Sequence, residues 1–140
     1  MTSTPTGDRP AAPCGITATL LAAGTCDTGI TARVGGRAEV TVQEITLAPG
    51  ASTDWHYHPG PLIVVVRSGT LTRTLHDRTR LTQAAGSAFV EPAGPHRVHL
   101  GSNLGTEPVV LLITYVLPAG SPLARPAPCP FPALPAPGWR

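Results

Sequence analysis

The chain contains no lysine, few charged residues and very few aromatic ones. All ten basic side chains are arginine, and with eight acidic residues the formal net charge is only +2. The arginines are scattered singly, without the basic block or basic–aromatic run that is typical of a nucleic-acid-binding surface. A nucleic-acid partner is therefore not expected.

Long apolar runs are also missing. The longest, Val109–Val116, contains Thr114 and Tyr115 and is far shorter than the roughly 20 residues that span a bilayer. Residues 1–13 are polar and contain proline, without the cationic start and apolar centre of a secretory signal. These absences predict a cytoplasmic protein with no membrane partner.

Cysteine chemistry is equally restricted. Cys14, Cys26 and Cys129 are odd in number and lack C-x-x-C spacing, which argues against a disulfide framework and against a zinc–cysteine site. We expect reduced thiols that serve local packing. A catalytic cysteine would need a histidine beside it, which spacing along the chain does not reveal.

Proline and glycine, in contrast, are abundant. Seventeen prolines and 15 glycines interrupt the chain so often that long helices are hard to accommodate. Between these breaks lie short segments that alternate polar and apolar residues, as half-buried strands do. The predicted strands are Ile16–Ala22, Ala38–Leu47, Ser52–His58, Leu62–Arg67, Thr70–His76, Leu81–Gln83, Ser87–Glu91, Arg97–Leu100 and Pro108–Leu117. Short strands at this spacing predict an all-β antiparallel sandwich or barrel.

The length of 140 residues suits one domain with its own core and is too short for two. Residues 1–13 have the composition of a flexible segment, and residues 14–117 carry the predicted strands. Residues 118–140 differ because eight of the 23 are proline, which prevents a helix and supplies few ladder hydrogen bonds. We therefore expect a flexible N-terminal segment, a β-barrel domain and a proline-rich C-terminal arm.

Two histidines, His56 and His58, stand near the end of the predicted strand Ser52–His58. Because side chains alternate along a strand, both imidazoles share one face with Asp54. Two imidazoles at i and i+2 can converge on one cation, and neutral imidazole suits iron, copper, nickel, manganese or zinc. Taken alone, the pair also fits two exposed or packed histidines.

The spacing around these histidines resembles the two motifs of the cupin superfamily. The first motif, G-x5-H-x-H-x3-4-E-x6-G, is similar to residues 50–69, with His56 and His58 as its histidines. The second, G-x5-P-x-G-x2-H-x3-N, is similar to residues 86–96, which end at His96. Both motifs occur in order at a normal separation. The resemblance implies a small single-domain bacterial cupin, an antiparallel jelly-roll β-barrel.

In cupins the two histidines and the glutamate of the first motif and the histidine of the second bind one metal ion inside the barrel. The resemblance therefore implies His56, His58 and His96 as metal ligands. The glutamate position is occupied by Leu62, which cannot bind a metal, so a three-histidine site is implied. The spacer before His96 is one residue short, and His99, on the opposite strand face, is the alternative third ligand.

A site of three neutral imidazoles would leave a divalent cation its full charge, which a carboxylate ligand would lower. Such a site favours an anionic chelating substrate and leaves coordination positions open, as catalytic sites do. Three-histidine cupins similar to this chain include iron dioxygenases of thiols and 1,3-diketones, and manganese or zinc lyases. The expected cofactor is one divalent ion, with Fe2+ favoured and Zn2+, Mn2+ or Ni2+ as alternatives.

Two nearby acids, Asp54 and Glu91, could replace the lost glutamate, and Tyr115 is a third candidate for the chemistry. Asp54 shares the histidine face, although it also suits the start of a strand. Glu91 can hold a histidine N–H or act as a general base, or it can bond local backbone or an arginine instead. Tyr115 can donate to a bound anion, with packing as the alternative.

The segment Leu62–Val66 is apolar on both faces, and Trp55 and Tyr57 are expected to point away from the histidine face. A sheet with one solvated face would alternate here instead. The outer face is therefore expected to be covered by the proline-rich tail or by a second subunit. We predict a homodimer formed through this face.

The function implied by the resemblance is a metal-dependent enzyme acting on a small anionic or chelating organic substrate. The first hypothesis is a non-haem Fe(II) dioxygenase. The second is a zinc or manganese enzyme that uses its ion as a Lewis acid in cyclase, dehydratase, lyase or isomerase chemistry of secondary metabolism. The third is a ligand-binding or sensor cupin without catalysis.

Overall fold

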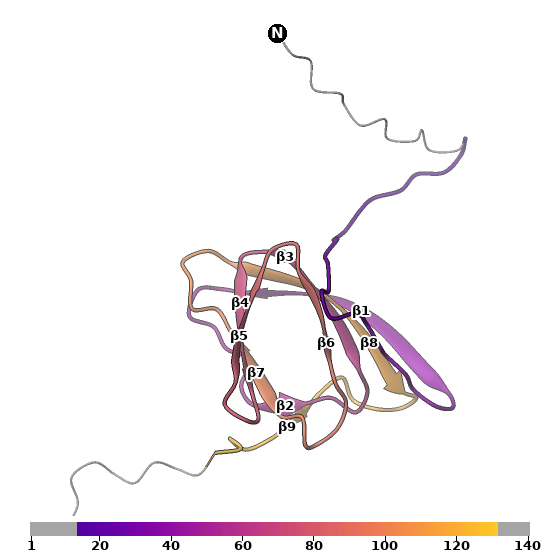
Figure 1. Cartoon of the computed structure of the whole chain (residues 1–140). Coiled ribbons are helices and arrows are strands. Elements are labelled where there is room, and N and C mark those ends of the chain that lie inside the picture. The colour runs from indigo at the N-terminus through magenta and orange to yellow at the C-terminus, as the bar shows by residue number, and fades with distance from the viewer. Residues whose placement is uncertain (1–13, 132–140) are drawn as a thin grey trace, which may run out of the picture.

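The computed structural model describes residues 14–131, which form two antiparallel sheets and no helix. The strands are β1 (Ala38–Leu47), β2 (His56–Tyr57), β3 (Leu62–Ser68), β4 (Thr70–Leu75), β5 (Arg80–Ala84), β6 (Ala88–Glu91), β7 (His99–Ser102), β8 (Val109–Pro118) and β9 (Arg125–Pro126). One sheet has the order β1-β8-β3-β6 and the other β5-β4-β7-β2-β9. The sheets face each other around one interior (Figure 1). The predicted all-β antiparallel sandwich is confirmed.

Two features of the prediction lie partly or wholly outside this range. The flexible segment expected at residues 1–13 is not among the described residues, and the C-terminal arm is described only as far as Phe131. Within residues 14–131, no helix is long and apolar enough to cross a membrane.

The strand predicted at Ile16–Ala22 is wrong. This segment pairs with no other part of residues 14–131, and Ile16 and Leu20 are 57% and 69% exposed. The first bridge to a sheet residue comes later, where Thr25 pairs with Ser87. Alternation of apolar residues predicts an extended chain. A β-strand also needs a neighbouring strand edge to hydrogen-bond with, and the local pattern does not show whether one is present.

Two predicted strands that carry histidines also differ from the structure. The strand expected at Ser52–His58 is only His56–Tyr57, because the backbone at Asp54 is left-handed, with a φ of 61°, and interrupts the extended chain. The strand expected at Arg97–Leu100 begins at His99. Local turn geometry therefore decides which side chains near these strands face inward.

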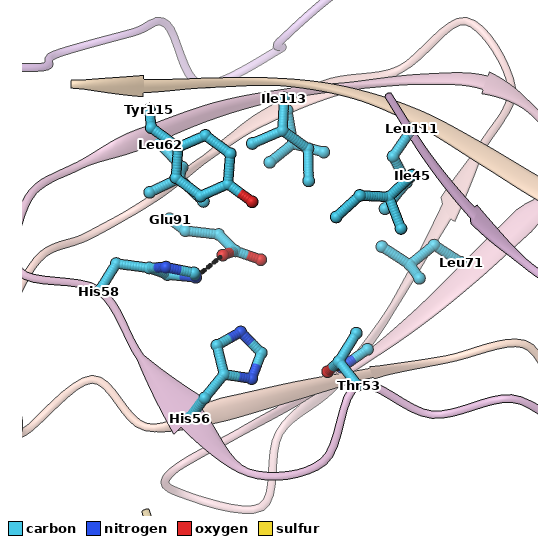
Figure 2. Close-up of a pocket in the computed structure, with 12 residues that line it drawn as sticks. Ile45, Thr53, His56, His58, Leu62, Leu71, Glu91, Leu111, Ile113 and Tyr115 are labelled. Atoms are coloured by element: carbon cyan, nitrogen blue, oxygen red, sulfur yellow. Dashed lines mark hydrogen bonds and ion pairs between the residues drawn. The ribbon is translucent and has the colours of Figure 1, made fainter. Parts of the chain in front are cut away.

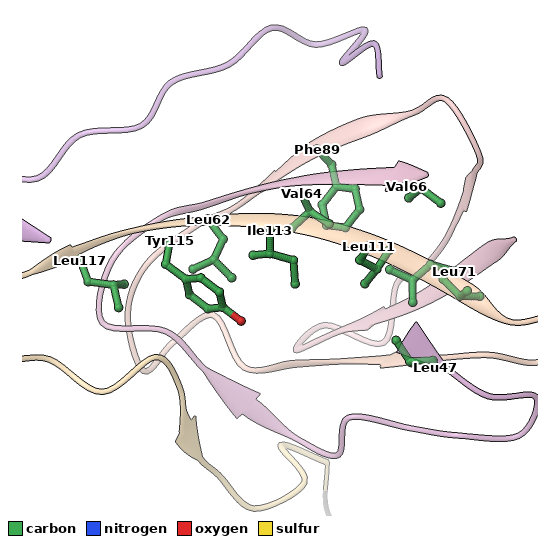
Figure 3. Close-up of a cluster of buried hydrophobic side chains, with 11 residues drawn as sticks. Leu47, Leu62, Val64, Val66, Leu71, Phe89, Leu111, Ile113, Tyr115 and Leu117 are labelled. Carbon is green, nitrogen blue, oxygen red and sulfur yellow. The ribbon is translucent and has the colours of Figure 1, made fainter. Parts of the chain in front are cut away.

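The core is a cluster of apolar side chains between the two sheets (Figure 3). Strand β8 illustrates how it forms, since buried and half-buried residues alternate from Val109 to Leu117. One face of the strand therefore points inward throughout, as a period of two requires. Each buried aliphatic side chain of this kind contributes about 1.5–3 kcal/mol to stability. The full cluster comprises Leu47, Leu62, Val64, Val66, Leu71, Phe89, Val109, Leu111, Ile113, Tyr115 and Leu117.

After β8 the chain folds back along β2. Strand β9 pairs with β2, and the Ala127 N–H donates to the Trp55 carbonyl oxygen at 3.1 Å. Phe131 packs edge-on against Trp55, with ring centroids 5.3 Å apart. Gly24 packs closely against Val65 of β3: a Cβ atom added to Gly24 would lie 3.1 Å from Cγ1 of Val65. Parts of the apolar outer face are thus covered by the chain itself, and the homodimer stays a prediction.

Candidate metal centre

Four side chains from both sheets meet inside the barrel. His56 lies in β2, His58 directly follows it, His99 begins β7 and Glu91 ends β6. Each offers one nitrogen or oxygen atom, and these four atoms all lie within 4.8 Å of one another. His58, His99 and Glu91 are buried and His56 is half-buried. Three imidazoles and a carboxylate in one buried cluster form a candidate metal site.

The strand register brings these residues together. In one sheet His56 of β2 is paired directly with His99 of β7, so both side chains project from the same face. In the other sheet Leu62 of β3 is paired with Glu91 of β6 on one side and with Tyr115 of β8 on the other. The row Tyr115–Leu62–Glu91 therefore faces the pair of histidines across the interior.

The Nδ1 atoms of the three histidines are already engaged by the backbone. Each lies 2.7–2.8 Å from a carbonyl oxygen: His56 from that of Asp54, His58 from that of Leu123 and His99 from that of Arg97. Because a carbonyl oxygen only accepts, these contacts assign the proton to Nδ1 and leave Nε2 with its lone pair. This is how the surroundings of metal-binding histidines usually fix the tautomer.

The contacts of Glu91 indicate that a cation belongs between these groups. Its Oε2 lies 3.0 Å from His58 Nε2 and 2.8 Å from His99 Nε2, yet neither nitrogen makes a hydrogen bond of acceptable geometry. Nitrogen lone pairs that face a carboxylate oxygen repel it unless a positive charge lies nearby. Two ligand atoms about 2.1 Å from one ion at right angles are about 3 Å apart, close to these separations. The residues present therefore fit a divalent metal ion.

In the absence of an ion, protons would compete for the same atoms. Burial disfavours charged His99, but the adjacent Glu91 carboxylate outweighs it and raises the pKa of His99. Burial alone would raise the pKa of Glu91, yet the imidazoles of His58 and His99 that face the carboxylate hold it well below its usual range. Burial lowers the pKa of His56, and the neighbouring histidines act in the same direction. The carboxylate is thus ionised and ready to bind a cation.

The assignment of His96 as the third ligand is wrong. His96 lies in an exposed turn, whereas His99 is buried in the cluster. The sequence did carry a signal for His99, because His99 and Asn103 match the H-x3-N end of the second motif. Asn103 is 1% exposed, and its Nδ2 donates to the carbonyl oxygens of Leu47 and Glu107 at 3.0 and 2.7 Å. These buried hydrogen bonds of Asn103 support the match of His99 and Asn103 to the end of the second motif.

The site does contain a carboxylate, and of the two acids that could replace the lost glutamate, Asp54 and Glu91, the structure places Glu91 in the cluster. Glu91 stands directly opposite Leu62 in the β3–β6 pair, and cross-strand partners project from the same face of a sheet. The carboxylate missing at position 62 is thus supplied by the adjacent strand. A divalent ion bound here would have one unit of its charge neutralised, which removes the argument for an anionic substrate that rested on three neutral ligands.

The other two predicted catalytic residues occupy different positions. The Asp54 side chain is exposed and outside the four-residue cluster, while its carbonyl oxygen orients His56. The Tyr115 hydroxyl donates to Gln43 Oε1 at 3.0 Å, and its ring centroid lies 5.9 Å from that of His58. Burial raises the pKa of Tyr115, and the charge of Glu91 adds to the shift, so the phenol is neutral near pH 7.

A cavity of about 60 Å³ opens beside the cluster. Figure 2 shows His56, His58 and Glu91 at one end of this space, with aliphatic side chains around the other. A larger pocket of about 430 Å³ extends outward to Trp55 and Pro126. Both spaces are bordered by His56, His58 and Tyr115. The outer pocket has the size of a small-molecule site.

Comparison with known proteins agrees with this architecture. The chain matches the model of the cupin domain over residues 43–115, and no curated protein matches it. A conserved protein of unknown function from Streptococcus pyogenes is 25% identical, with 64% of this chain and 73% of that chain covered and a TM-score of 0.52. The polyketide cyclase RemF from Streptomyces resistomycificus is 22% identical, with 69% and 67% covered and a TM-score of 0.52.

A structure of DMSP lyases is 24% identical, covers 64% of this chain and 44% of that chain, and has a TM-score of 0.55. At this level of identity the lyase and the cyclase share the fold with this chain, and no more is drawn from them. The match to the cupin domain, however, spans more than half of the chain and contains all four residues of the cluster. The chain belongs to the cupin family.

Proposed function

We propose that this cupin is a metal-dependent enzyme that acts on a small organic substrate held in the pocket beside the cluster. The observation that carries the proposal is the convergence of three Nε2 atoms and the Glu91 carboxylate next to a cavity. A divalent ion supplies a Lewis acid there, and iron in addition supplies reactivity towards O2. Iron or manganese accepts more than four ligands, which leaves room for a substrate.

Oxygenation with non-haem iron is the first candidate reaction. The interior cavity is walled mostly by aliphatic side chains, among them Ile45, Leu111 and Ile113. Such walls exclude water from reactive species. Apart from the cluster itself, the lining offers only the hydroxyls of Thr53 and Tyr115 as groups that exchange a proton. A reaction driven by O2 depends less on protein acids and bases than an elimination or an isomerisation does.

Lewis-acid chemistry is the second candidate, and Tyr115 is the observation that favours it. Its neutral phenol borders both the cavity and the outer pocket. By exchanging its present acceptor, Gln43 Oε1, it can donate a hydrogen bond or a proton to an oxygen on which negative charge develops. A cyclase, dehydratase, lyase or isomerase needs such a donor near its substrate.

Metal content and oxygen dependence distinguish the two candidates. Protein purified without chelators should contain iron, and the iron-loaded form should consume O2 with a member of a panel of small thiols and 1,3-diketones. The zinc-loaded form should fall to background, because zinc has no redox chemistry. Equal conversion by the zinc form under anaerobic conditions would instead establish the Lewis-acid reaction. Turnover that survives in a metal-free His56→Ala variant would contradict both.

The variant Tyr115→Phe tests the proton donor. If Tyr115 stabilises developing charge, kcat should fall about 100-fold, the usual cost of removing one such donor. Metal content should be unchanged, because the hydroxyl is not part of the four-residue cluster. Tyr57→Phe is the matched control, since Tyr57 borders neither the cavity nor the outer pocket. An unchanged kcat would remove Tyr115 from the chemistry, and a loss of metal would give it a structural role.

A further inference from the structure

A further pocket, distinct from the interior cavity and the outer pocket, lies between β4, β6 and β7, and its lining is basic. Its volume is about 210 Å³, and His99 borders it although that residue does not line the cavity beside the metal cluster. The ionisable groups in the lining are Arg73, His76, Arg97 and His99, and the remaining lining residues are apolar. Strand β6 belongs to one sheet and β4 and β7 belong to the other, and the two sheets face each other across the interior (Figure 1). The pocket therefore presents positive charge without an acidic group in its lining.

Arg73 is the residue that distinguishes this pocket from an ordinary basic surface. It projects inward from β4 and is only 7% exposed, with its Cζ 3.9 Å from the centre of the Phe89 ring. Among residues 14–131 no hydrogen bond or ion pair holds its guanidinium, and its Nε is buried without a partner. The exposed Arg67, in contrast, pairs with Glu44 at 2.7 Å.

Within residues 14–131 no carboxylate forms an ion pair with Arg73, although the charge of Glu91 opposes the effect of burial in part. Glu91 directs Oε2 to His58 and His99. Asp27 borders a neighbouring pocket together with Arg73, yet within the described part of the chain it forms no ion pair with it. Burying a cation without a partner is unfavourable, and a contact with an aromatic face offsets that only in part. The lowered pKa of Arg73, caused by burial, reflects this cost.

We propose that this pocket binds a small anion, with a phosphate or carboxylate group held by Arg73 and Arg97, at a site separate from the metal centre. A guanidinium matches both groups through paired, charge-assisted hydrogen bonds. The volume admits a group of a few heavy atoms and is below the usual range for a drug-sized ligand. Arg97 also links the two sites, because its carbonyl oxygen accepts from His99 Nδ1 at 2.8 Å.

Inorganic phosphate and acetate, titrated separately at low ionic strength into the metal-loaded protein, test the proposal. At least one should bind saturably by calorimetry and raise Tm with concentration. Arg97→Gln and Arg73→Met should each weaken that binding about 10-fold or more, the cost of losing a charge-assisted hydrogen bond. Arg80→Gln is the control, because Arg80 is exposed on β5 and does not line the pocket. If Arg73→Met fails to fold, the exposed Arg97 still decides the result.

Binding of the anion at the metal itself would give a different pattern. His56 does not line this pocket, so a His56→Ala variant should keep the anion response. Loss of the response in His56→Ala, with wild-type binding in Arg97→Gln, would overturn the proposal and place the anion at the metal. It would be overturned equally if neither anion binds the wild type, or if Arg80→Gln weakens binding as much as Arg97→Gln does.

Discussion

Replacing Glu91 by glutamine should lower the affinity of the protein for divalent metal by at least about 100-fold. Substitution of a residue that only orients a metal ligand already costs about 10–100-fold, so loss of the carboxylate in the cluster should reach the upper end of that range. Glutamine keeps the shape and removes the charge that faces His58 and His99. The measurement is metal affinity by competition with a chelator of known affinity, with Glu107→Gln as the control because that side chain is exposed.

The exchange of Leu62 and Glu91 makes this test sharper. Because the two residues are directly paired across β3 and β6, the double variant Leu62→Glu/Glu91→Leu returns a carboxylate to the same face of the sheet. It should recover metal affinity to within about 10-fold of the wild type. Wild-type affinity in Glu91→Gln would show that the carboxylate is not a ligand. A folded double variant without metal affinity would show that the two positions are not equivalent.

Removing the imidazole of His99 should have an effect of similar size, whereas removing that of His96 should have none. His99 is buried with its Nε2 in the cluster, and a folded His99→Ala variant should lose metal affinity by at least about 100-fold. His96 is exposed in a turn, so His96→Ala should bind metal as the wild type does. Metal content by elemental analysis and affinity by chelator competition measure both.

The pair of histidine variants also tests which spacing governs the second motif. Circular dichroism and the unfolding midpoint of each apo variant provide the check that the barrel is intact. If His96→Ala loses the metal and His99→Ala keeps it, then the spacing that ends at His96 would be the correct one. The pairing of His56 with His99 predicts the opposite outcome.

These predictions share one feature of the molecule, which is that the cluster is assembled across strands. His56 and His99 are partners in one sheet, and Leu62, Glu91 and Tyr115 form a row in the other. A motif counted along the chain follows one strand at a time. It therefore located His56 and His58 and registered Leu62 as a lost ligand, but it left both Asp54 and Glu91 as candidates for the missing carboxylate.

The all-β class, the first two histidines and the long strands followed from local pattern. The residues Ala38–Leu47 were predicted with the bounds that the structure has, because they are rich in β-branched residues and lie between the breaks Gly35-Gly36 and Pro49-Gly50. Short segments were less certain, since single turns redirect them. The left-handed backbone at Asp54 and the turn at His96 are examples, and neither conformation is specified by the polar–apolar pattern around it.

Which side chains meet depends on how the strands pair and pack. The two-residue alternation of side chains along a strand shows which face of that strand a residue occupies. It contains no information about the neighbouring strand or its register. The place of Glu91 opposite Leu62, and the burial of Arg73 without a partner, both depend on that register and on the packing of the two sheets. Contacts between residues distant in sequence are set by the free energy of the whole barrel, and local pattern cannot encode them.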